Sequence, residues 1–443
     1  MSEGIASPRA RMTTLTATAT GWPFGKGWIL FPMGAILGIT LLVARPRGGQ
    51  YAVWLDSSAR IHESLIGAGP IVALWAAVVG ASVGGKSFLF AALARRRRGR
   101  QFIAHCLTLA AWSAVAYACG LAPLMLWTVS TSNWGRPFLG DAIIALAGIV
   151  LFTVVGFALG ALLPDLRWVV LVPVAALIYL ILPQQASRAF SVISPVQAWL
   201  ETARFQPNGA VALYFVIFAL AALTCALTSF ADAPMASGHT GRIQLPTLAA
   251  AGALLVLVAI PFVWRPDLYV VGDRPQGLCR SSGPAAVCVH PAHSKSLPMV
   301  VNAVGAFQRA GAGAFINSVT DLDISEVYTG PPGQIIVDVA PTTTPSALRL
   351  SLATGALGSQ VCDVKFPQKD ETNSLPADLG SAITSRVLRT AGDAAGAQQV
   401  ASTVIAQGNL QKIDRLSDAA FRNLLTMRRT KIQQCSLALT DLK

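Results

Sequence analysis

The hydrophobic positions of the chain gather into long runs over its first 264 residues and then give way to short, mixed runs. A helix that crosses a membrane needs about 20 mostly apolar residues, because the hydrocarbon core of a bilayer is about 30 Å thick. Seven stretches meet or nearly meet this requirement: roughly 27–44, 65–84, 103–127, 140–163, 167–183, 209–231 and 246–264. The fifth stretch is short and contains Pro173. The pattern therefore predicts a polytopic α-helical membrane protein with about six or seven transmembrane helices.

The remaining residues, 265–443, contain short runs typical of strands and of helices, which predicts a C-terminal α+β domain. About 180 residues suffice for one independent core. Short β-branched runs predict strands near 268–271, 286–290 and 334–340, and helical periodicity follows near 297–310, 377–390, 398–407 and 416–442. The expected organisation is a cytoplasmic segment 1–26, a transmembrane domain 27–264 and an extracytoplasmic domain 265–443.

Composition agrees with this division. Of the 443 residues 53% are hydrophobic and 12% are charged, about half the charged fraction of a soluble protein. This excludes a disordered chain, a fibrous protein and an ordinary cytosolic enzyme as the whole molecule. Residues 1–264 hold 17 of the 34 basic residues but 7 of the 21 acidic ones. This basic excess lies beside apolar runs, where it indicates membrane orientation rather than nucleic-acid binding.

Orientation follows from the connection after the second apolar stretch, which carries the densest basic cluster: Lys86, Arg95, Arg96, Arg97, Arg98 and Arg100. Positive charge is retained in the cytoplasm, so this loop and the N-terminus are expected inside. Seven spans then place residues from 265 onward outside, whereas an even number would place them inside. The expected location is the plasma membrane, within the lipid bilayer.

The cysteines divide in the same way. Cys106, Cys119 and Cys225 fall within apolar stretches, whereas Cys279, Cys288, Cys362 and Cys435 lie in the C-terminal region. An even number there suits two disulfides in an oxidising exterior. Cys279 and Cys288 would close a short loop around a Ser-Ser-Gly-Pro turn, and Cys362 would then pair with Cys435.

Two motifs resemble a phosphate-binding loop and a metal site, but their sequence context does not favour either function. Residues 80–87 fit the phosphate-binding pattern G-x-x-x-x-G-K-[ST], but they follow a membrane span rather than a strand of a parallel sheet. We interpret them as the glycine-rich end of that span. His290 and His293 offer two of the three or four ligands that zinc needs, and Pro291 lies between them. We therefore expect no catalytic, cofactor or metal site in this chain.

Two other features concern assembly. The segment from Ser87 and Phe88 to Arg100 is a short apolar stretch followed by arginines, which suits a helix on the cytoplasmic face that contacts a partner or anionic lipid, or a topology signal alone. Gly156 and Gly160 form a small-xxx-small pair that allows close helix packing, within the chain or in a dimer. Asp141, near the outer end of the same span, either lines a cavity or is hydrated at the interface.

Taken together, the membrane half resembles the permease subunits of ABC-2-type transporters. The resemblance is carried by the basic loop from Lys86 to Arg100, by AGIVLFTVVGFALGALLP at 147–164, and by the outer segment with Ser194-Pro195-Val196. The C-terminal part, with VCVHP at 287–291, looks like an extracytoplasmic domain of some actinobacterial permeases of this type. The family core has six spans, so a seventh is needed to deliver this domain outside.

The resemblance implies a division of labour. A separate cytosolic ABC ATPase would bind ATP and magnesium, and a second, identical or different permease chain would complete the path. The coupling segment would comprise Ser87, Phe88, Arg95, Arg96, Arg97 and Arg98. The alternative is a membrane-anchored sensor or interaction protein whose outer domain binds a ligand or partner. A membrane enzyme is the least favoured class, because no convergent set of acid, base or nucleophile is present.

Overall fold

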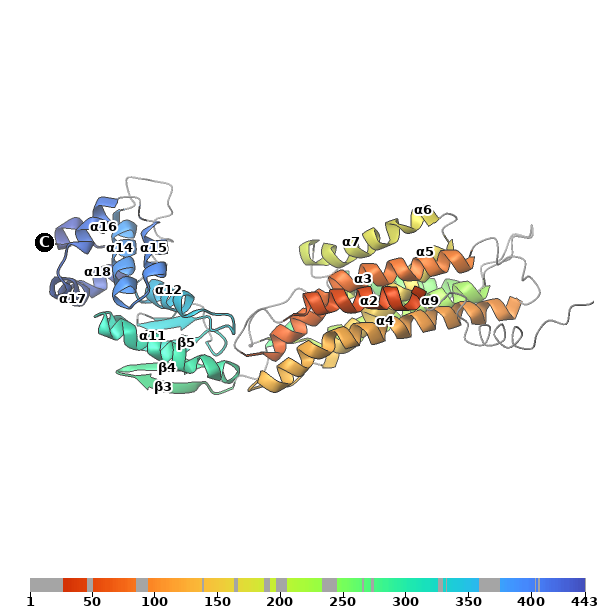
Figure 1. Ribbon diagram of the computed structural model, residues 1–443, viewed down its shortest axis with the longest axis horizontal. Coiled ribbons are helices and arrows are strands. Elements are labelled where there is room, and N and C mark those ends of the chain that lie inside the picture. Colours follow the sequence, from red (N-terminus) through yellow and green to blue (C-terminus); the bar gives the residue numbers. More distant parts are fainter. Residues whose placement is uncertain are drawn as a thin grey trace, which may run out of the picture.

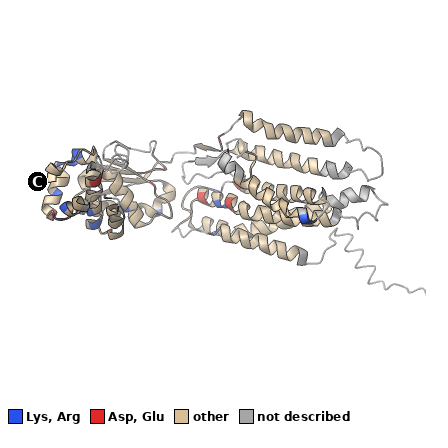
Figure 2. Cartoon of the chain, turned by 90° about the horizontal axis from the view of Figure 1, so that it is seen from above, with Lys and Arg blue, Asp and Glu red and all other residues tan. Residues whose placement is uncertain are grey.

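The computed structural model describes residues 27–45, 51–84, 95–137, 139–162, 166–186, 192–196, 205–232, 245–264, 267–271, 275–325, 330–331, 333–357, 375–402, 404 and 407–442. A bundle of long helices forms one part of the molecule, and a domain of helices and strands lies at one end of it (Figure 1). In the described residues, charged side chains are concentrated in the C-terminal domain and are sparse in the bundle (Figure 2).

All seven apolar stretches of the sequence are helical. The helices of the bundle are α2 (Gly27–Val43), α3 (Trp54–Gly84), α4 (Arg95–Thr131), α5 (Leu139–Leu162), α6 (Leu166–Val169), α7 (Leu171–Ala186), α9 (Gly209–Asp232) and α10 (Leu245–Trp264). Within the described residues, four helices are long and apolar enough to cross a membrane, and they correspond to α3, α4, α5 and α9. The apolar parts of α2, α7 and α10 are shorter, so a count of six or seven spans remains a prediction.

Close contact between α3 and α5 organises the bundle. A Cβ atom added to Gly156 would lie 2.5 Å from the carbonyl oxygen of Ala73, and one added to Gly160 would lie 2.0 Å from that of Ala77. On the facing helix, a Cβ atom at Gly80 would lie 2.3 Å from the carbonyl oxygen of Phe157. Side chains at these positions would keep the two backbones apart, so the glycines explain why the helices can approach this closely.

The C-terminal domain is built on a four-stranded sheet. Its strands are β3 (Leu278–Ser282), β4 (Ala285–Val289), β5 (Ser318–Asp321) and β6 (Gln334–Val337), in the order β3-β4-β5-β6. The first pair is antiparallel and the other two pairs are parallel. Burial alternates along β4, β5 and β6, so one face forms the core with α11 (Leu297–Arg309) and α12 (Pro345–Ala356).

Among its described residues, the domain has five further α-helices: α14 (Leu375–Thr390), α15 (Ala394–Ala401), α16 (Gln407–Asp414), α17 (Asp418–Met427) and α18 (Arg429–Gln433). The prediction of one helix over 416–442 is wrong. The chain leaves helical geometry at Arg428, where φ is −109° and ψ is 18°, and α18 ends after five residues. The strands β3 and β5 and the helix α12 were not predicted from the sequence.

A separate two-stranded sheet connects the two parts of the molecule. Strand β1 (Phe205–Pro207) precedes α9, and strand β2 (Tyr269–Val271) follows α10. The two strands are antiparallel, with Phe205 opposite Val271 and Pro207 opposite Tyr269. The predicted strand near 268–271 therefore exists, but it pairs with the bundle side of the chain rather than with the sheet of the domain.

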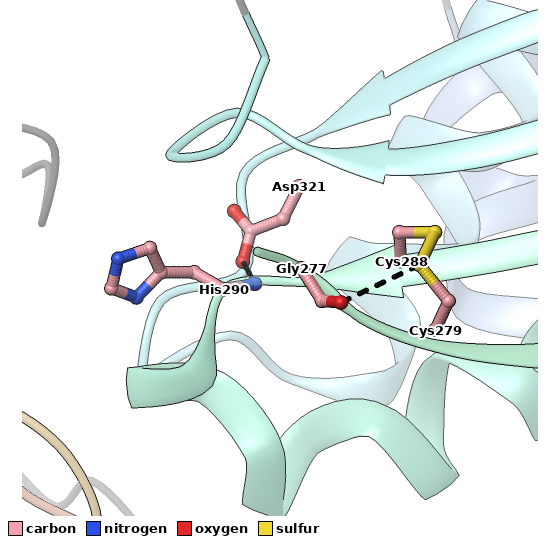
Figure 3. Close-up of a disulfide and its surroundings, with 5 residues drawn as sticks. All are labelled: Gly277, Cys279, Cys288, His290 and Asp321. Atoms are coloured by element: carbon pink, nitrogen blue, oxygen red, sulfur yellow. Dashed lines mark hydrogen bonds between the residues drawn. A yellow bond between two sulfur atoms is a disulfide. The ribbon is translucent and has the colours of Figure 1, made fainter. Parts of the chain in front are cut away.

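The predicted disulfide between Cys279 and Cys288 is present (Figure 3). The two cysteines face one another in the β3–β4 pair, where they occupy opposite register positions. The turn that joins these strands contains Gly283, whose φ of +55° is readily adopted only by glycine. Cys435 is also disulfide-bonded, and its predicted partner, Cys362, lies outside the described residues.

Candidate functional site

The C-terminal domain is docked on the end of the bundle where α3 begins and α4 ends (Figure 1). The domain contributes the 3-10 helix η2 (Pro291–Ser296), which connects β4 to α11. Ala292 of η2 packs in a small apolar cluster with Tyr51, which precedes α3, and with Trp134, which follows α4. We call this contact region the junction. It links the domain directly to the two longest helices of the bundle.

Polar and aromatic contacts reinforce the junction. Within the described part of the chain, three hydrogen bonds cross it: Tyr51 Oη with Ser296 Oγ at 3.0 Å, Lys295 Nζ to Thr131 O at 2.9 Å, and Asn133 Nδ2 to Ser294 Oγ at 3.0 Å. The ring of Trp134 meets that of His290 edge to face, with 4.5 Å between centroids. Aromatic pairs in this arrangement contribute about 0.5–1.5 kcal/mol beyond their burial.

A buried cluster of His293, Asp321 and Asp323 lies beside the junction. The Nδ1 atom of His293 is 2.6 Å from Oδ2 of Asp321, and its Nε2 atom is 3.7 Å from Oδ2 of Asp323. Asp321 ends β5, and His290 follows the last residue of β4. The carboxyl ends of adjacent parallel strands lie at the same edge of a sheet, so the topology brings these residues together.

Asp321 also organises the backbone around the cluster. Its Oδ2 atom accepts a hydrogen bond from the backbone N–H of His290 at 3.0 Å, and its Oδ1 atom accepts one from that of Asp323 at 3.2 Å. Figure 3 shows that the ring of His290 points away from this carboxylate while the backbone nitrogen faces it. The Asp321 side chain is fully buried. It therefore fixes the position of both loops that leave the sheet.

The two histidines have opposite electrostatic environments. Burial by itself lowers the pKa of His293, but the hydrogen bond and the negative charge of Asp321, helped by Asp323, outweigh it, so this pKa is raised. Burial lowers the pKa of His290 to about 4, and the positive charge of His293 acts in the same direction. The surrounding carboxylates thus favour the charged form of His293, whereas burial favours the neutral form of His290.

The same three side chains carry atoms that can bind a metal ion. Their ligand atoms lie within 4.8 Å of one another. One imidazole cannot bind a single ion through both nitrogens, so an ion on Nε2 would contact His293 and Asp323, while Asp321 would orient the ring from Nδ1. Two protein ligands fall short of the four that a structural zinc site uses. The described residues therefore fit a buried ion cluster better than a zinc centre.

His290 and His293 were recognisable from the sequence as candidate ligands, whereas Asp321 and Asp323 were not. The available signal is the sequence Asp-Leu-Asp at 321–323, directly after the run Ser318–Asp321 that forms β5. Recognising it requires that β5 be predicted and placed beside β4. Neither step was possible from the alternation of four residues alone.

The other predicted site residues belong to the N-terminal, apolar half of the sequence. Ser87 and Phe88 are outside the described residues, and Arg95 to Arg98 form the first turn of α4. Gly156 and Gly160 face α3 within the same chain, which is one of the two kinds of packing that the sequence allows. Gly80 of the phosphate-loop match lies inside α3, in helical rather than loop conformation.

Comparisons of the chain with protein-family models, with curated proteins and with solved structures find no match. Its function must therefore be argued from the arrangement of its own residues.

The junction is expected to weaken in acid. The pKa of His290 is about 4 in the folded protein and about 6.5 in an unfolded chain. The contribution of His290 to stability is complete above pH 6.5 and is lost as the pH falls from about 6.5 to about 4. Over this range the equilibrium constant for unfolding rises by up to tenfold per pH unit. Thermal unfolding of the purified full chain across this range measures the slope.

The variant His290→Asn separates this effect from general acid denaturation. Asparagine does not titrate, and its oxygen can replace Nδ1 as the acceptor of the hydrogen bond from the backbone N–H of Ala292. We expect a flatter profile between pH 6.5 and 4 for this variant, and an unchanged profile for Lys295→Gln. An unchanged slope in His290→Asn would assign the acid sensitivity to another group.

Proposed function

We propose that the chain is a permease subunit of an ABC-type transporter, which moves its substrate across the plasma membrane with energy from a separate cytosolic ATPase. The observation that carries this proposal is the separation of two features along α3 and α4. The C-terminal domain contacts the start of α3 and the end of α4, whereas the arginine cluster begins α4 at its other end.

The length of these helices makes the separation large. Helix α3 has 31 residues and α4 has 37, so at 1.5 Å per residue they are about 46 and 55 Å long. The hydrophobic core of a membrane is about 30 Å thick. The start of α3 lies beside the end of α4, where Ser57 Oγ and Thr128 Oγ1 are 2.6 Å apart. The arginine end and the junction therefore suit opposite sides of a bilayer.

This arrangement supports the proposed orientation without a count of spans. If the arginines remain in the cytoplasm, as the positive-inside rule predicts, then the domain at the other end is extracytoplasmic. The disulfide between Cys279 and Cys288 favours the same side, because disulfides persist in oxidising compartments. Two independent kinds of observation thus support the same proposed location of the domain.

In the proposed mechanism, the partner ATPase contacts the segment that includes Ser87, Phe88 and Arg95–Arg98. Helix α4 leads from this segment to Thr131, whose carbonyl oxygen accepts a hydrogen bond from Lys295 of the domain. A displacement of α4 at its cytoplasmic end would therefore be transmitted to the junction along a single continuous helix. A second permease chain, identical or different, would complete the transport path.

The test is purification of the tagged chain after expression with its neighbouring genes. We expect a stoichiometric ATPase whose ATP turnover depends on this chain. Replacing Arg95, Arg96, Arg97 and Arg98 by glutamine is expected to reduce this stimulated turnover at least tenfold, because the cationic contact surface is lost. Replacing the same four residues by lysine keeps the positive charge that determines membrane topology. This variant therefore separates an effect on membrane insertion from an effect on ATPase contact.

A matched control removes equal charge from the other end of the molecule. Arg280, Arg309, Arg415 and Arg422 are exposed in the C-terminal domain, and their joint replacement by glutamine should leave ATP turnover unchanged. A wild-type chain that purifies without any ATPase would contradict the transporter proposal.

The junction also favours a second candidate function. A domain that touches α3 and α4 through η2 could report binding of an outer ligand or protein to the cytoplasmic side, as in a membrane-anchored sensor. Purification with an extracytoplasmic partner, and without an ATPase, would support this alternative.

A further inference from the structure

Two ionisable side chains from two long apolar helices meet inside the bundle. His62 of α3 and Asp141 of α5 are 96% and 99% buried, and the Nε2 atom of His62 is 3.3 Å from Oδ1 of Asp141. Neither oxygen of Asp141 has a hydrogen-bond partner among the described residues. Ionisable groups are costly inside the membrane-spanning part of a protein, and those that occur there commonly have a function.

The other ring nitrogen of His62 determines how the pair is protonated. Its Nδ1 atom is 2.9 Å from the backbone carbonyl oxygen of Pro195. A carbonyl oxygen can only accept, so Nδ1 must carry a proton and donate it. A neutral imidazole would then present a lone pair on Nε2 to the lone pairs of the Asp141 carboxylate. This contact becomes favourable only when one further proton lies between Nε2 and Oδ1.

The bundle is shaped to hold the Pro195 carbonyl in this place. Gly148 of α5 lies against Pro195, and a Cβ atom added to this glycine would lie 2.7 Å from the Cβ atom of Pro195. The hydroxyl of Ser194 accepts a hydrogen bond from the backbone N–H of Val196 and so stabilises the turn. The third member of the site is therefore positioned by packing and by local hydrogen bonding.

Neighbouring polar groups have partners of their own. On α3, Arg60 donates to Asp56 and to the carbonyl oxygen of Arg45. On α4, Tyr117 donates to the carbonyl oxygen of Ile61. Glu63 follows His62 and is half-buried, and the segment 192–196 contains no titratable side chain. Among these groups, Asp141 is the one that faces the Nε2 atom of His62.

We infer that His62, Asp141 and the Pro195 carbonyl form a proton-binding site between α3, α5 and the segment 192–196. The bound proton lies between Nε2 of His62 and Oδ1 of Asp141. This inference goes beyond the proposed function and does not depend on it. A movement that parts α3 from α5 hydrates both groups and lets the proton leave, so the packing of these helices is linked to proton release.

The experiment reads the protonation of His62 directly. The full chain is labelled with ¹⁵N-histidine, reconstituted in lipid nanodiscs, and its ring nitrogens are observed by NMR at about pH 8.5, two units above the usual histidine pKa of about 6.5. We expect an imidazolium signal that is lost in His62→Gln.

The variant Asp141→Asn tests the role of the carboxylate while preserving its shape. The amide can donate to Nε2, so no shared proton is needed, and His62 should become a neutral imidazole with its proton on Nδ1. Asp56→Asn is the matched control: its carboxylate pairs with Arg60 near the start of the same helix, and the His62 signal should not change. Because Asp141→Asn is isosteric, it keeps the test valid if His62→Gln does not fold.

Two results support the inference and one overturns it. An imidazolium at His62 supports it, and so does a neutral His62 accompanied by an infrared band of a protonated carboxyl group that is absent in Asp141→Asn. A neutral His62 without such a carboxyl band at about pH 8.5 shows that no proton is held, and the site is then a structural contact only.

Discussion

Replacement of Gly160 by leucine is expected to disrupt the bundle. A Cβ atom at this position would lie 2.0 Å from the carbonyl oxygen of Ala77 and 2.6 Å from its Cα atom, so the clash is with backbone that cannot rotate away. Overpacking in a core commonly lowers the free energy of unfolding by about 1–3 kcal/mol. A leucine that separates two helix backbones should reach or exceed the upper end of this range.

The measurement is thermal unfolding of the detergent-solubilised chain, followed by the fraction that remains monodisperse in size-exclusion chromatography. Gly252→Leu in α10 is the matched control, because a Cβ atom at Gly252 meets no atom within 4 Å. We expect a large fall in the midpoint for Gly160→Leu and little change for the control. Equal midpoints would mean that α3 and α5 are not in the close contact described above.

The second large effect is expected at Arg386 in the C-terminal domain. This side chain of α14 is 7% exposed, and it donates to the carbonyl oxygens of Ile413 and Leu416, near the end of α16. Its guanidinium also lies 4.4 Å from the ring centroid of Phe421. One side chain therefore holds α14, α16 and α17 together.

Arg386→Leu leaves the two carbonyl oxygens without their donor, and at about 1–3 kcal/mol for each unsatisfied group we expect a loss of about 2–6 kcal/mol in the stability of the domain. Arg389→Leu, on the same helix, is the control. Arg389 is half-exposed and pairs with Asp414 at 3.2 Å, a kind of contact that contributes about 0–1 kcal/mol.

Pulse proteolysis in urea, followed with an antibody to a C-terminal tag, measures both variants in the full chain. The interpretation fails if Arg386→Leu and Arg389→Leu unfold at the same urea concentration. Arg386→Lys should give an intermediate result, because an ammonium group cannot reproduce the planar arrangement of donors.

These two positions illustrate what sequence reasoning can and cannot supply. The glycine pair was recognised because its spacing of four residues places both glycines on one helix face, whatever the partner helix. The facing residues, Ala73 and Ala77, belong to no distinctive sequence motif. The choice between packing within the chain and packing in a dimer therefore required the structure. Arg386 carries no signal at all, since its importance lies in two carbonyl groups about 30 residues further on.

The C-terminal domain shows the same limit. The apolar run Ala285–Val289 and the amphipathic helix Leu297–Arg309 are visible as local patterns, and both are present. Strand β5 has four residues, too few for an alternating pattern to be distinctive. Because this strand was not predicted, the aspartates at 321 and 323 were not recognised as candidate site residues. Helix α12 could have been found, because Thr344 caps it and Pro345 occupies its first turn, but no helix was predicted there.

Only part of the candidate proton site could be predicted from the sequence. Asp141 was noticed as an ionisable group in an apolar stretch, whereas His62 was not predicted as its partner. Their meeting depends on the register of α3 against α5, which the glycines at 80, 156 and 160 determine through tertiary contact. The carbonyl of Pro195 comes from a third segment with no periodic pattern.

The small sheet of β1 and β2 has a consequence for the kinetics of the junction. Because β2 is paired to the bundle, the domain is tethered by only six residues between Val271 and Leu278, a reach of about 25 Å at full extension. A domain that undocks therefore stays at a millimolar effective concentration near its own binding surface. Redocking is a first-order event within one molecule, and a free competitor would need to be present at comparable concentration to prevent it.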